Sequence, residues 1–255
     1  MNEAKYKLEA QSRMPKVEVK IISELYRHQI TEFLDGRENL GIELGVATGA
    51  FSRRLLESGK FRILFGVDVY GDIHDVNEYK NALKKIGIES AHKLLRLTFD
   101  DALDIFPDEY FDFIYVDGFA HTGEEGGKTL VDWYKKLKIG GIMAGDDYHD
   151  DWPLVMWAVN HFASQLGTQI TLTGKIMDEP YSKYPTWFFQ KSRVFDPDAA
   201  PLDSYLVEIA QKERMRIQRL RMHASKSFIY RILRFIKRIV TNPDFFLQTH
   251  IRAKE

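Results

Sequence analysis

Carboxylates are concentrated where an apolar stretch of the sequence ends, in GIMAGDDYHDDW at residues 141–152. Four aspartates occupy six consecutive positions there: Asp146, Asp147, Asp150 and Asp151. Asp117 ends another apolar stretch, FDFIYVDG. Carboxylates held close together do not all ionise unless a cation shares their site. We therefore predict that Asp117, Asp146 and Asp147 bind Mg²⁺ or another hard divalent ion, which prefers oxygen ligands.

The alternative for Asp147 is a helix-capping role without metal. We assign Asp150 and Asp151 to the N-terminus of the next helix, where the helix dipole favours acids. A bound metal would lower the pKa of a substrate hydroxyl and neutralise the alkoxide that forms when this hydroxyl loses its proton.

Two histidines near these aspartates in the sequence are candidates for the base that removes the proton from such a substrate hydroxyl. Histidine suits this role because its ordinary pKa is about 6.5. His121, four residues after Asp117, is the first candidate, and His149 is the second. The alternative for both is an ordinary polar loop residue. Asp117 completes the predicted catalytic set.

A glycine-containing turn follows the apolar stretch NLGIEL. Glu43, Gly45 and Gly49 form an E-x-G-x-x-x-G pattern, in which glycines let the backbone approach a ligand. The pattern differs from the G-x-G-x-x-G fingerprint of dinucleotide-binding proteins, because an acid replaces the first glycine. An acid there repels a pyrophosphate and attracts an ammonium group. A plain tight turn is the alternative.

Two more aspartates follow the next apolar stretches. Asp68 ends RILFGVD, about 20 residues after the glycine turn, where nucleoside-binding sheets place a carboxylate that accepts hydrogen bonds from ribose hydroxyls. Its alternative is a cap of the following turn. Asp100 in LTFDDAL could reach an adenine amino group or could be a helix N-cap.

The elements that must position these residues alternate along the chain. Residues 17–34 have apolar positions at helical spacing and predict an amphipathic helix. Apolar strands are predicted at 39–46, 62–70, 92–99, 111–118 and 140–148, with helices at 50–58, 76–87, 100–106, 124–137 and 153–167. Residues 169–175 and 186–192 predict a closing antiparallel pair. Regular alternation predicts an α/β fold, a doubly wound and mainly parallel seven-stranded sheet, with ligands at the carboxyl ends of the strands.

The predicted domain organisation has three parts. Residues 1–37 form an N-terminal helical segment, 38–194 the ligand-binding domain, and 195–255 a linker and a helical tail. From Lys212 to Glu255 the sequence contains 12 Lys or Arg and 3 Asp or Glu. Residues 225–240 predict a basic amphipathic helix. The surface that this helix contacts is an anionic membrane, a partner subunit in a homo-oligomer, or the chain's own acidic domain.

Bulk composition excludes several classes of protein. The 255 residues include no cysteine, which excludes disulfides, zinc fingers and cysteine nucleophiles and fits a cytoplasmic location. The net charge of −1 does not indicate a nucleic-acid-binding protein. No apolar run approaches the roughly 20 residues that span a bilayer.

The stretches IELGVATGAFSRRLLES, FGVDVYGD, LTFDDAL and FDFIYVDGFAH…GGIMAGDDY, in this order, resemble class I S-adenosylmethionine-dependent methyltransferases. The VDG-x-x-H and DDY pieces are similar to the branch of macrocin-type sugar O-methyltransferases and cephalosporin hydroxylase-like proteins. The resemblance covers residues 38–192. It implies a Rossmann-like fold and S-adenosylmethionine as cofactor.

The resemblance also implies roles for individual residues. Glu43, Gly45 and Gly49 would border the methionine part of the cofactor, with Asp117 nearby. Asp68 would hold the ribose, and the adenine would lie between Phe99 and Asp100. Some family members have an acid two residues after the aspartate at position 117, where this chain has Phe119.

We therefore predict an S-adenosylmethionine-dependent O-methyltransferase that acts on a sugar or a hydroxylated small molecule with the help of a divalent metal. The alternatives are a catalytically silent nucleoside-binding or interaction module and a metal-independent small-molecule methyltransferase. Residues 122–129, TGEEGGKT, nearly match a phosphate-binding loop, but Thr122 replaces its first glycine.

Overall fold

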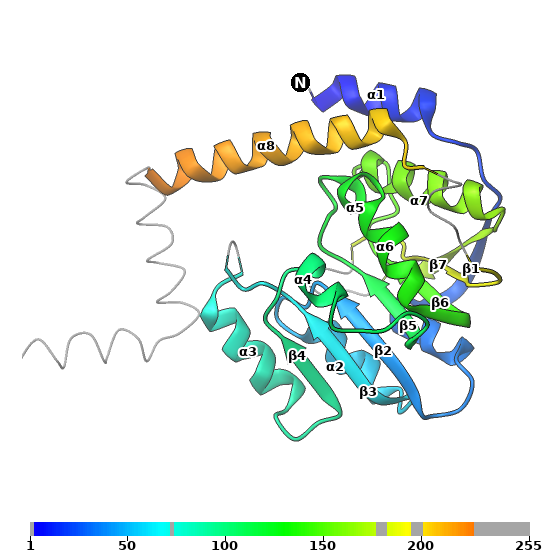
Figure 1. The fold of residues 1–255 in the computed structure, drawn as a ribbon, viewed down its shortest axis with the longest axis vertical. Coiled ribbons are helices and arrows are strands. Elements are labelled where there is room, and N and C mark those ends of the chain that lie inside the picture. Colours follow the sequence, from blue (N-terminus) through cyan, green and yellow to red (C-terminus); the bar gives the residue numbers. More distant parts are fainter. Residues whose placement is uncertain (1–2, 72–73, 177–182, 195–200, 227–255) are drawn as a thin grey trace, which may run out of the picture. The chain divides into compact units, whose positions relative to one another are not determined.

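A computed structural model describes residues 3–71, 74–176, 183–194 and 201–226 (Figure 1). The chain divides into two compact units, Met1–Gln211 and Lys212–Glu255. All the predicted site residues lie in the first unit. The second unit is described only as far as Lys226, so most of the predicted basic helix at 225–240 lies outside the described residues.

The first unit is built on one eight-stranded sheet, which confirms the predicted α/β class with one strand more than expected. Its strands are β1 (Val19–Tyr26), β2 (Asn39–Leu44), β3 (Phe61–Val67), β4 (His92–Leu95), β5 (Phe111–Val116), β6 (Leu137–Gly145), β7 (Ile170–Lys175) and β8 (Trp187–Gln190). Their order across the sheet is β1-β7-β8-β6-β5-β2-β3-β4. Only β8 runs antiparallel to its neighbours, β6 and β7. The carboxyl ends of β6, β5, β2 and β3 therefore lie in a row at one edge, where the sequence places the candidate residues.

Helices follow the strands along the chain. They are α1 (Glu3–Arg13), the 3-10 helix η1 (Arg27–Phe33), α2 (Ala50–Glu57), α3 (Val76–Ile86), α4 (Phe99–Leu103), α5 (Gly123–Gly126), α6 (Lys128–Lys136), α7 (Pro153–Leu166) and α8 (Ser204–Lys226). Pro153 opens α7 as predicted, because the first turn of a helix needs no amide hydrogen from that residue. Trp152 is the N-cap residue of α7, so Asp150 and Asp151 precede the helix rather than lying in its first turn.

The predicted helix at 17–34 is wrong. Residues 19–26 form β1, which pairs with β7 in parallel from Val19 with Ile170 to Tyr26 with Lys175. Ile21 is 61% exposed, although the helical pattern places it on the buried face with Leu25, which is 7% exposed. Alternating β-branched residues in VEVKII favour a strand once a partner is available. Because β1 belongs to the main sheet, no domain boundary falls at residue 38.

Side chains from the two faces of the sheet form two apolar layers. Ile114 and Val116 of β5 pack in one cluster with residues of α6 and α7, such as Trp133 and Trp157. Phe113 and Tyr115 of the same strand pack in the other cluster with α2 and η1. A sheet covered on both faces leaves its strand ends as the accessible polar region. No helix among the described residues is long and apolar enough to cross a membrane.

Candidate functional site

The glycine turn after β2 is in contact with the end of β5. Gly45 has φ 98°, and a Cβ there would lie 1.9 Å from the carbonyl oxygen of Asp117. Only glycine fits so close an approach. Gly49 is the N-cap residue of α2, so the turn leads directly into a helix N-terminus, as predicted. The turn and Asp117 therefore form adjoining parts of one site.

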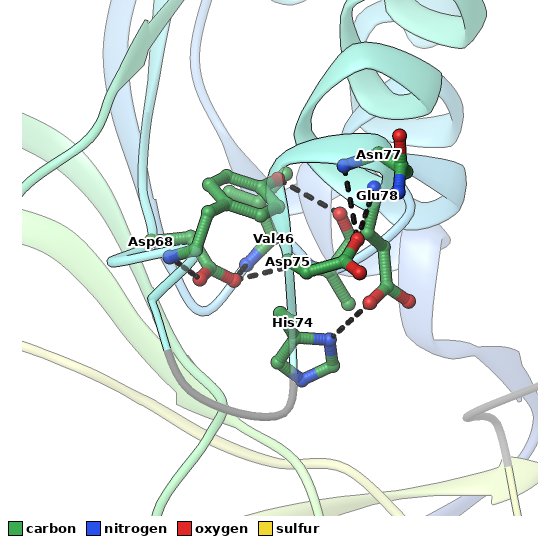
Figure 2. Close-up of polar contacts among 8 residues, drawn as sticks. Val46, Asp68, His74, Asp75, Asn77 and Glu78 are labelled. Carbon is green, nitrogen blue, oxygen red and sulfur yellow. Dashed lines mark hydrogen bonds and ion pairs between the residues drawn. The ribbon is translucent and has the colours of Figure 1, made fainter. Parts of the chain in front are cut away.

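Asp68 at the end of β3 holds this turn in place (Figure 2). Its Oδ2 accepts hydrogen bonds from the amides of Val46 at 3.1 Å and Ala47 at 2.9 Å, and its Oδ1 accepts one from Tyr70 at 3.1 Å. The hydroxyl of Tyr70 donates to the carbonyl of Ala47 at 2.8 Å. A carboxylate has about four acceptor positions, so Asp68 can still accept a bond from a ribose hydroxyl. Its predicted ribose role stays a prediction.

The entry to α3 lies close to Asp68 (Figure 2). Asp75 caps this helix by accepting hydrogen bonds from the amides of Asn77 at 2.9 Å and Glu78 at 3.3 Å. The ring nitrogen Nδ1 of His74 lies 3.0 Å from a carboxylate oxygen of Glu78. These local bonds fix where the chain re-enters the fold beside the glycine turn.

Phe99 and Asp100 point in different directions. The ring of Phe99 packs edge-on against Phe119 at 4.9 Å and lies above Gly118 at the end of β5. Asp100 is 68% exposed and is ion-paired with Lys128 at 2.6 Å. The N-cap of α4 is Thr98, whose hydroxyl accepts from the amide of Asp101, so the alternative role of Asp100 as an N-cap is wrong. The predicted role of Phe99 beside the adenine stays a prediction, and Asp100 is turned toward Lys128.

Glu43 is buried beneath the glycine turn. It is 1% exposed and accepts a hydrogen bond from the hydroxyl of Ser52 in α2. Burial raises the pKa of Glu43 to about 8, against the opposing effects of Ser52 and of the Arg27 guanidinium. The side chain that the sequence suggested for an ammonium group is therefore engaged with α2.

Sequence reasoning missed Arg27, the first residue of η1. It is 4% exposed, and its Nη1 donates to Oδ2 of Asp146 at 3.0 Å. The guanidinium also lies over the ring of Phe51, 4.3 Å from its centre. Although burial opposes the charge, neighbouring Tyr115, Asp146, Asp117 and Glu43 raise the pKa of Arg27. This side chain supplies the cation that the crowded carboxylates require.

The other oxygen of Asp146 is also occupied. Oδ1 accepts a hydrogen bond from the hydroxyl of Thr186 at 3.2 Å, and Thr186 shares a bond with the hydroxyl of Tyr115. Burial nevertheless raises the pKa of Asp146. Asp146 is thus bound on both sides by protein groups from η1 and from the chain just before β8.

Asp117 and Asp147 lie close enough to Asp146 for their charges to interact. Burial, followed by the charges of Asp146 and Asp147, raises the pKa of Asp117 well above its ordinary value. Burial and Asp146 raise the pKa of Asp147 to about 7. Asp147 also has φ 63°, an uncommon conformation for a residue other than glycine. The predicted convergence of these strand ends is therefore present, and all three of its carboxyl groups, Asp117, Asp146 and Asp147, are protonated more readily than usual.

The predicted Mg²⁺ site has no support in this arrangement. Among the described residues, no group of three His, Asp or Glu side chains is arranged to hold a metal ion. The physical reason lies in Asp146, whose two oxygens already bind Arg27 and Thr186. A guanidinium fixed in this position also competes electrostatically with a divalent ion. The donor set of Asp117, Asp146 and Asp147 does not fit the ion, and we assign no step to it.

The two candidate histidines both pack against aromatic rings. His121 packs edge-on against the ring of Trp152 at 4.7 Å. His149 stacks on Tyr184 at 4.5 Å, and its Nδ1 accepts a hydrogen bond from the amide of Asp151 at 3.1 Å. With Nδ1 used as an acceptor, the proton of neutral His149 lies on Nε2. The assignment of either histidine as the base stays a prediction.

Comparison with known proteins bears on the class of this fold. Residues 39–148 match a family model described as a methyltransferase domain. Spermidine synthase from Thermotoga maritima is similar in structure with a TM-score of 0.50 and 16% identity, over 73% of this chain and 69% of that one. The N-methyltransferase NodS from Bradyrhizobium japonicum gives 0.45 and 18%, over 66% and 95%. The CurJ carbon methyltransferase gives 0.45 and 17%, over 62% of this chain and half of that one.

No curated protein sequence matches the chain significantly. The sheet order, the glycine turn and the matched family model define a methyltransferase domain with a Rossmann-like fold. Residues 39–148 are therefore similar to a methyltransferase domain. The predicted macrocin-type branch has no support from these comparisons.

Proposed function

We propose that this chain transfers the methyl group of S-adenosylmethionine to a hydroxyl oxygen of a sugar or another hydroxylated small molecule. The observation that carries the proposal is the group of carboxyl side chains at the ends of β5 and β6, directly beside the glycine turn. Asp117 and Asp147 lie there with raised pKa values, next to the ion pair of Arg27 and Asp146.

The cofactor side of the proposal rests on the turn after β2. The turn leads into the N-terminus of α2, Asp68 binds the amides of Val46 and Ala47, and the ring of Phe99 lies near Gly118. Doubly wound sheets bind nucleoside cofactors at this place, beyond the carboxyl ends of their strands. Because Gly45 is in contact with the backbone of Asp117, a methyl group carried at the turn would lie near the end of β5.

The oxygen acceptor is supported by the chemistry of those carboxyl groups. A hydroxyl must lose its proton as its oxygen attacks the methyl carbon, and a general base works best when its pKa is close to the working pH. Asp147, with a pKa of about 7, meets that condition by burial rather than through a metal. Most of the acceleration then comes from holding the oxygen in line with the sulfonium.

The proposal is tested with S-adenosylmethionine carrying a ¹³C-labelled methyl group and the methyl glycoside of glucosamine, which offers hydroxyls and an amine in one molecule. We expect a signal at the chemical shift of an O-methyl group, together with S-adenosylhomocysteine. A product labelled only on nitrogen would contradict the oxygen acceptor. Failure of the full chain to bind S-adenosylhomocysteine in calorimetry would refute the cofactor assignment itself.

The metal is tested separately in the same assay. Because Arg27 already neutralises Asp146, we expect product formation in EDTA to match product formation in millimolar MgCl₂. Loss of the product in EDTA, restored by MgCl₂, would reinstate the metal.

A further inference from the structure

The segment that nearly matches a phosphate-binding loop forms a left-handed helical turn. Every residue from Gly123 to Gly127 has a positive φ, including Glu124 at φ 53°, ψ 40° and Glu125 at φ 51°, ψ 45°. Its hydrogen bonds run from the amide of Gly126 to the carbonyl of Thr122 at 2.8 Å and from Gly127 to Gly123 at 3.0 Å. Left-handed helical geometry costs roughly 1–2 kcal/mol for each residue that has a side chain. Such a conformation persists only where surrounding structure enforces it.

Packing against α7 enforces this turn. A Cβ at Gly123 would lie 2.0 Å from the carbonyl oxygen of Leu154, in the first turn of α7, so the two backbones are in direct contact. Figure 1 shows α5 beside α7, after the end of β5. The turn therefore has a fixed position at the acceptor side of the site.

The consequence of this geometry is a buried carboxyl group. Glu124 is 2% exposed, and no described residue donates a hydrogen bond to its Oε2. Asp147 exerts a larger electrostatic effect on Glu124 than does Glu125, its immediate neighbour in the chain. The charges of Asp147 and Asp146 at the end of β6 both act on Glu124, so its carboxyl group belongs to the same acidic region. An acceptor atom left without a partner in a buried position costs about 1–3 kcal/mol, so it calls for an explanation.

A second buried polar atom without a hydrogen-bond partner in the described part of the chain lies near the junction of α5 with the start of α7. The indole Nε1 of Trp152, the N-cap residue of α7, is buried and has no acceptor among the described residues. The ring of Trp152 packs against His121, three residues before Glu124, and lies 6.5 Å from the ring of Tyr184. The junction thus offers one acceptor, one donor and several flat aromatic faces. A hydroxyl group both donates and accepts a hydrogen bond, whereas an ammonium group only donates.

We propose that the junction of α5 and α7 binds the hydroxylated acceptor, with Glu124 accepting a hydrogen bond from an acceptor hydroxyl and the indole N–H of Trp152 donating one. This inference rests on the function proposed above and names the residues that determine its substrate class. The rings of Trp152, His121 and Tyr184 suit the apolar face of a pyranose, since binding sites combine aromatic walls with a few polar groups.

Burial of Glu124 predicts that the site favours a neutral acceptor over an amine. Burial, then the charges of Asp147, Glu125 and Asp146, raises the pKa of Glu124 well above its ordinary value. A neutral carboxyl group offers an ammonium no charge to pair with, but it still accepts a hydrogen bond from a hydroxyl.

The test measures saturation-transfer NMR on the full chain with bound S-adenosylhomocysteine, using the methyl glycosides of glucose, mannose, galactose and rhamnose as probes. We expect Glu124→Met to weaken binding of the favoured glycoside by about tenfold or more, as for the loss of one buried hydrogen bond. Trp152→Phe, which keeps an aromatic ring but removes the indole N–H, should weaken it similarly. Glu124→Gln keeps a carbonyl acceptor in place of the neutral acid and should bind within about threefold of wild type.

The matched control is Glu125→Met, which makes the same substitution in the same backbone conformation and should leave probe binding unchanged. Glu124→Met should keep or raise the melting temperature, because it removes a buried oxygen without a partner. If Glu124→Met does not fold, the comparison of Trp152→Phe with wild type decides the question.

Three results would overturn the inference. They are wild-type binding of a glycoside by both Glu124→Met and Trp152→Phe, equal loss in Glu125→Met, and failure of wild type to bind any of the glycosides while it binds S-adenosylhomocysteine. The last result leaves the cofactor assignment intact, whereas failure to bind S-adenosylhomocysteine refutes the proposed function instead.

Discussion

The two halves of the strand-end edge are built in different ways. At the ends of β2 and β3, the carboxylate of Asp68 binds backbone amides of the adjoining turn and its own loop. At the ends of β5 and β6, the half-buried Asp117 and Asp147 have raised pKa values, as does the buried Glu124 of α5, and Arg27 reaches Asp146 from a distant part of the chain. In the half at β2 and β3, which we call the cofactor half after its proposed role, the carboxylate of Asp68 is hydrogen-bonded to the backbone. We call the half at β5 and β6 the acceptor half. The acceptor half keeps unmet hydrogen-bonding capacity, which is what a site for an exchangeable substrate requires.

The largest effect should come from removing the cation of the acceptor half. Arg27→Met leaves Asp146 buried without its charge partner, so we expect the free energy of unfolding in urea to fall by about 3–5 kcal/mol. The control is Arg53→Met, which breaks the exposed pair of Arg53 and Glu57 and should cost about 0.2–1 kcal/mol. Adding Asp146→Asn to Arg27→Met should recover part of the loss. Equal effects of the two single substitutions would remove the distinction between a buried and a surface pair.

A smaller effect should follow from loosening the cofactor half. Asp68→Asn replaces one of two carboxylate oxygens with an amide group that cannot accept the bonds from the turn. Hydrogen bonds to charged groups contribute about 1.5–3 kcal/mol, so calorimetry should show roughly 10- to 100-fold weaker binding of S-adenosylhomocysteine. Asp75→Ala, which removes the cap of α3, should lower stability by about 1 kcal/mol with unchanged cofactor binding. Unchanged binding in Asp68→Asn would show that the turn holds without the aspartate.

The pH dependence should separate the halves further. The folded-state pKa of Asp147, about 7, lies above its unfolded value near 3.9, so the folded state binds more protons between these values. The free energy of unfolding should therefore fall as the pH rises from about 4 to 7, by at most about 1.4 kcal/mol per pH unit for this group. The rate of methyl transfer should rise with ionisation of the base near pH 7. In Asp147→Asn, urea unfolding across this range should show a flatter profile, and an unaltered profile would contradict the assignment.

The smallest effect should come from Asp100. Its carboxylate is 68% exposed and paired with Lys128, outside the buried network, so Asp100→Asn should change stability by less than about 1 kcal/mol. We expect affinity for S-adenosylhomocysteine to change by less than about threefold in the same calorimetric assay. A tenfold loss would instead restore Asp100 to the adenine site and extend the cofactor half to the start of α4.

The sequence was sufficient to place those residues that directly follow a recognisable strand. Gly45, Asp68 and Asp117 could be placed because strand ends of a parallel sheet share one edge, and the expected alternation of strands and helices is present from β2 to α7. The strand at 19–26 could not be recognised, because a short apolar run fits helical and extended periods alike until β7 pairs with it.

Arg27 and Glu124 could not be found for a related reason. Arg27 is one of 36 Lys and Arg residues, and nothing near it in the chain marks it as buried. The only signal was indirect: crowded carboxylates need a cation, and the sequence argument supplied a metal in place of a guanidinium. Glu124 lies in the stretch TGEEGGKT, whose glycines indicated an unusual backbone but not its left-handed form.

Because β1 pairs with β7, the site is completed late during synthesis and folding of the chain. Arg27 directly follows β1, and β1 is aligned by Ile170 and the residues after it. A ribosome must therefore synthesise nearly the whole domain before the guanidinium can reach Asp146. Contacts so distant in sequence form slowly, and until then the carboxylates lack their counter-charge. We expect partly made chains to acquire the glycine turn first and competence for the acceptor last.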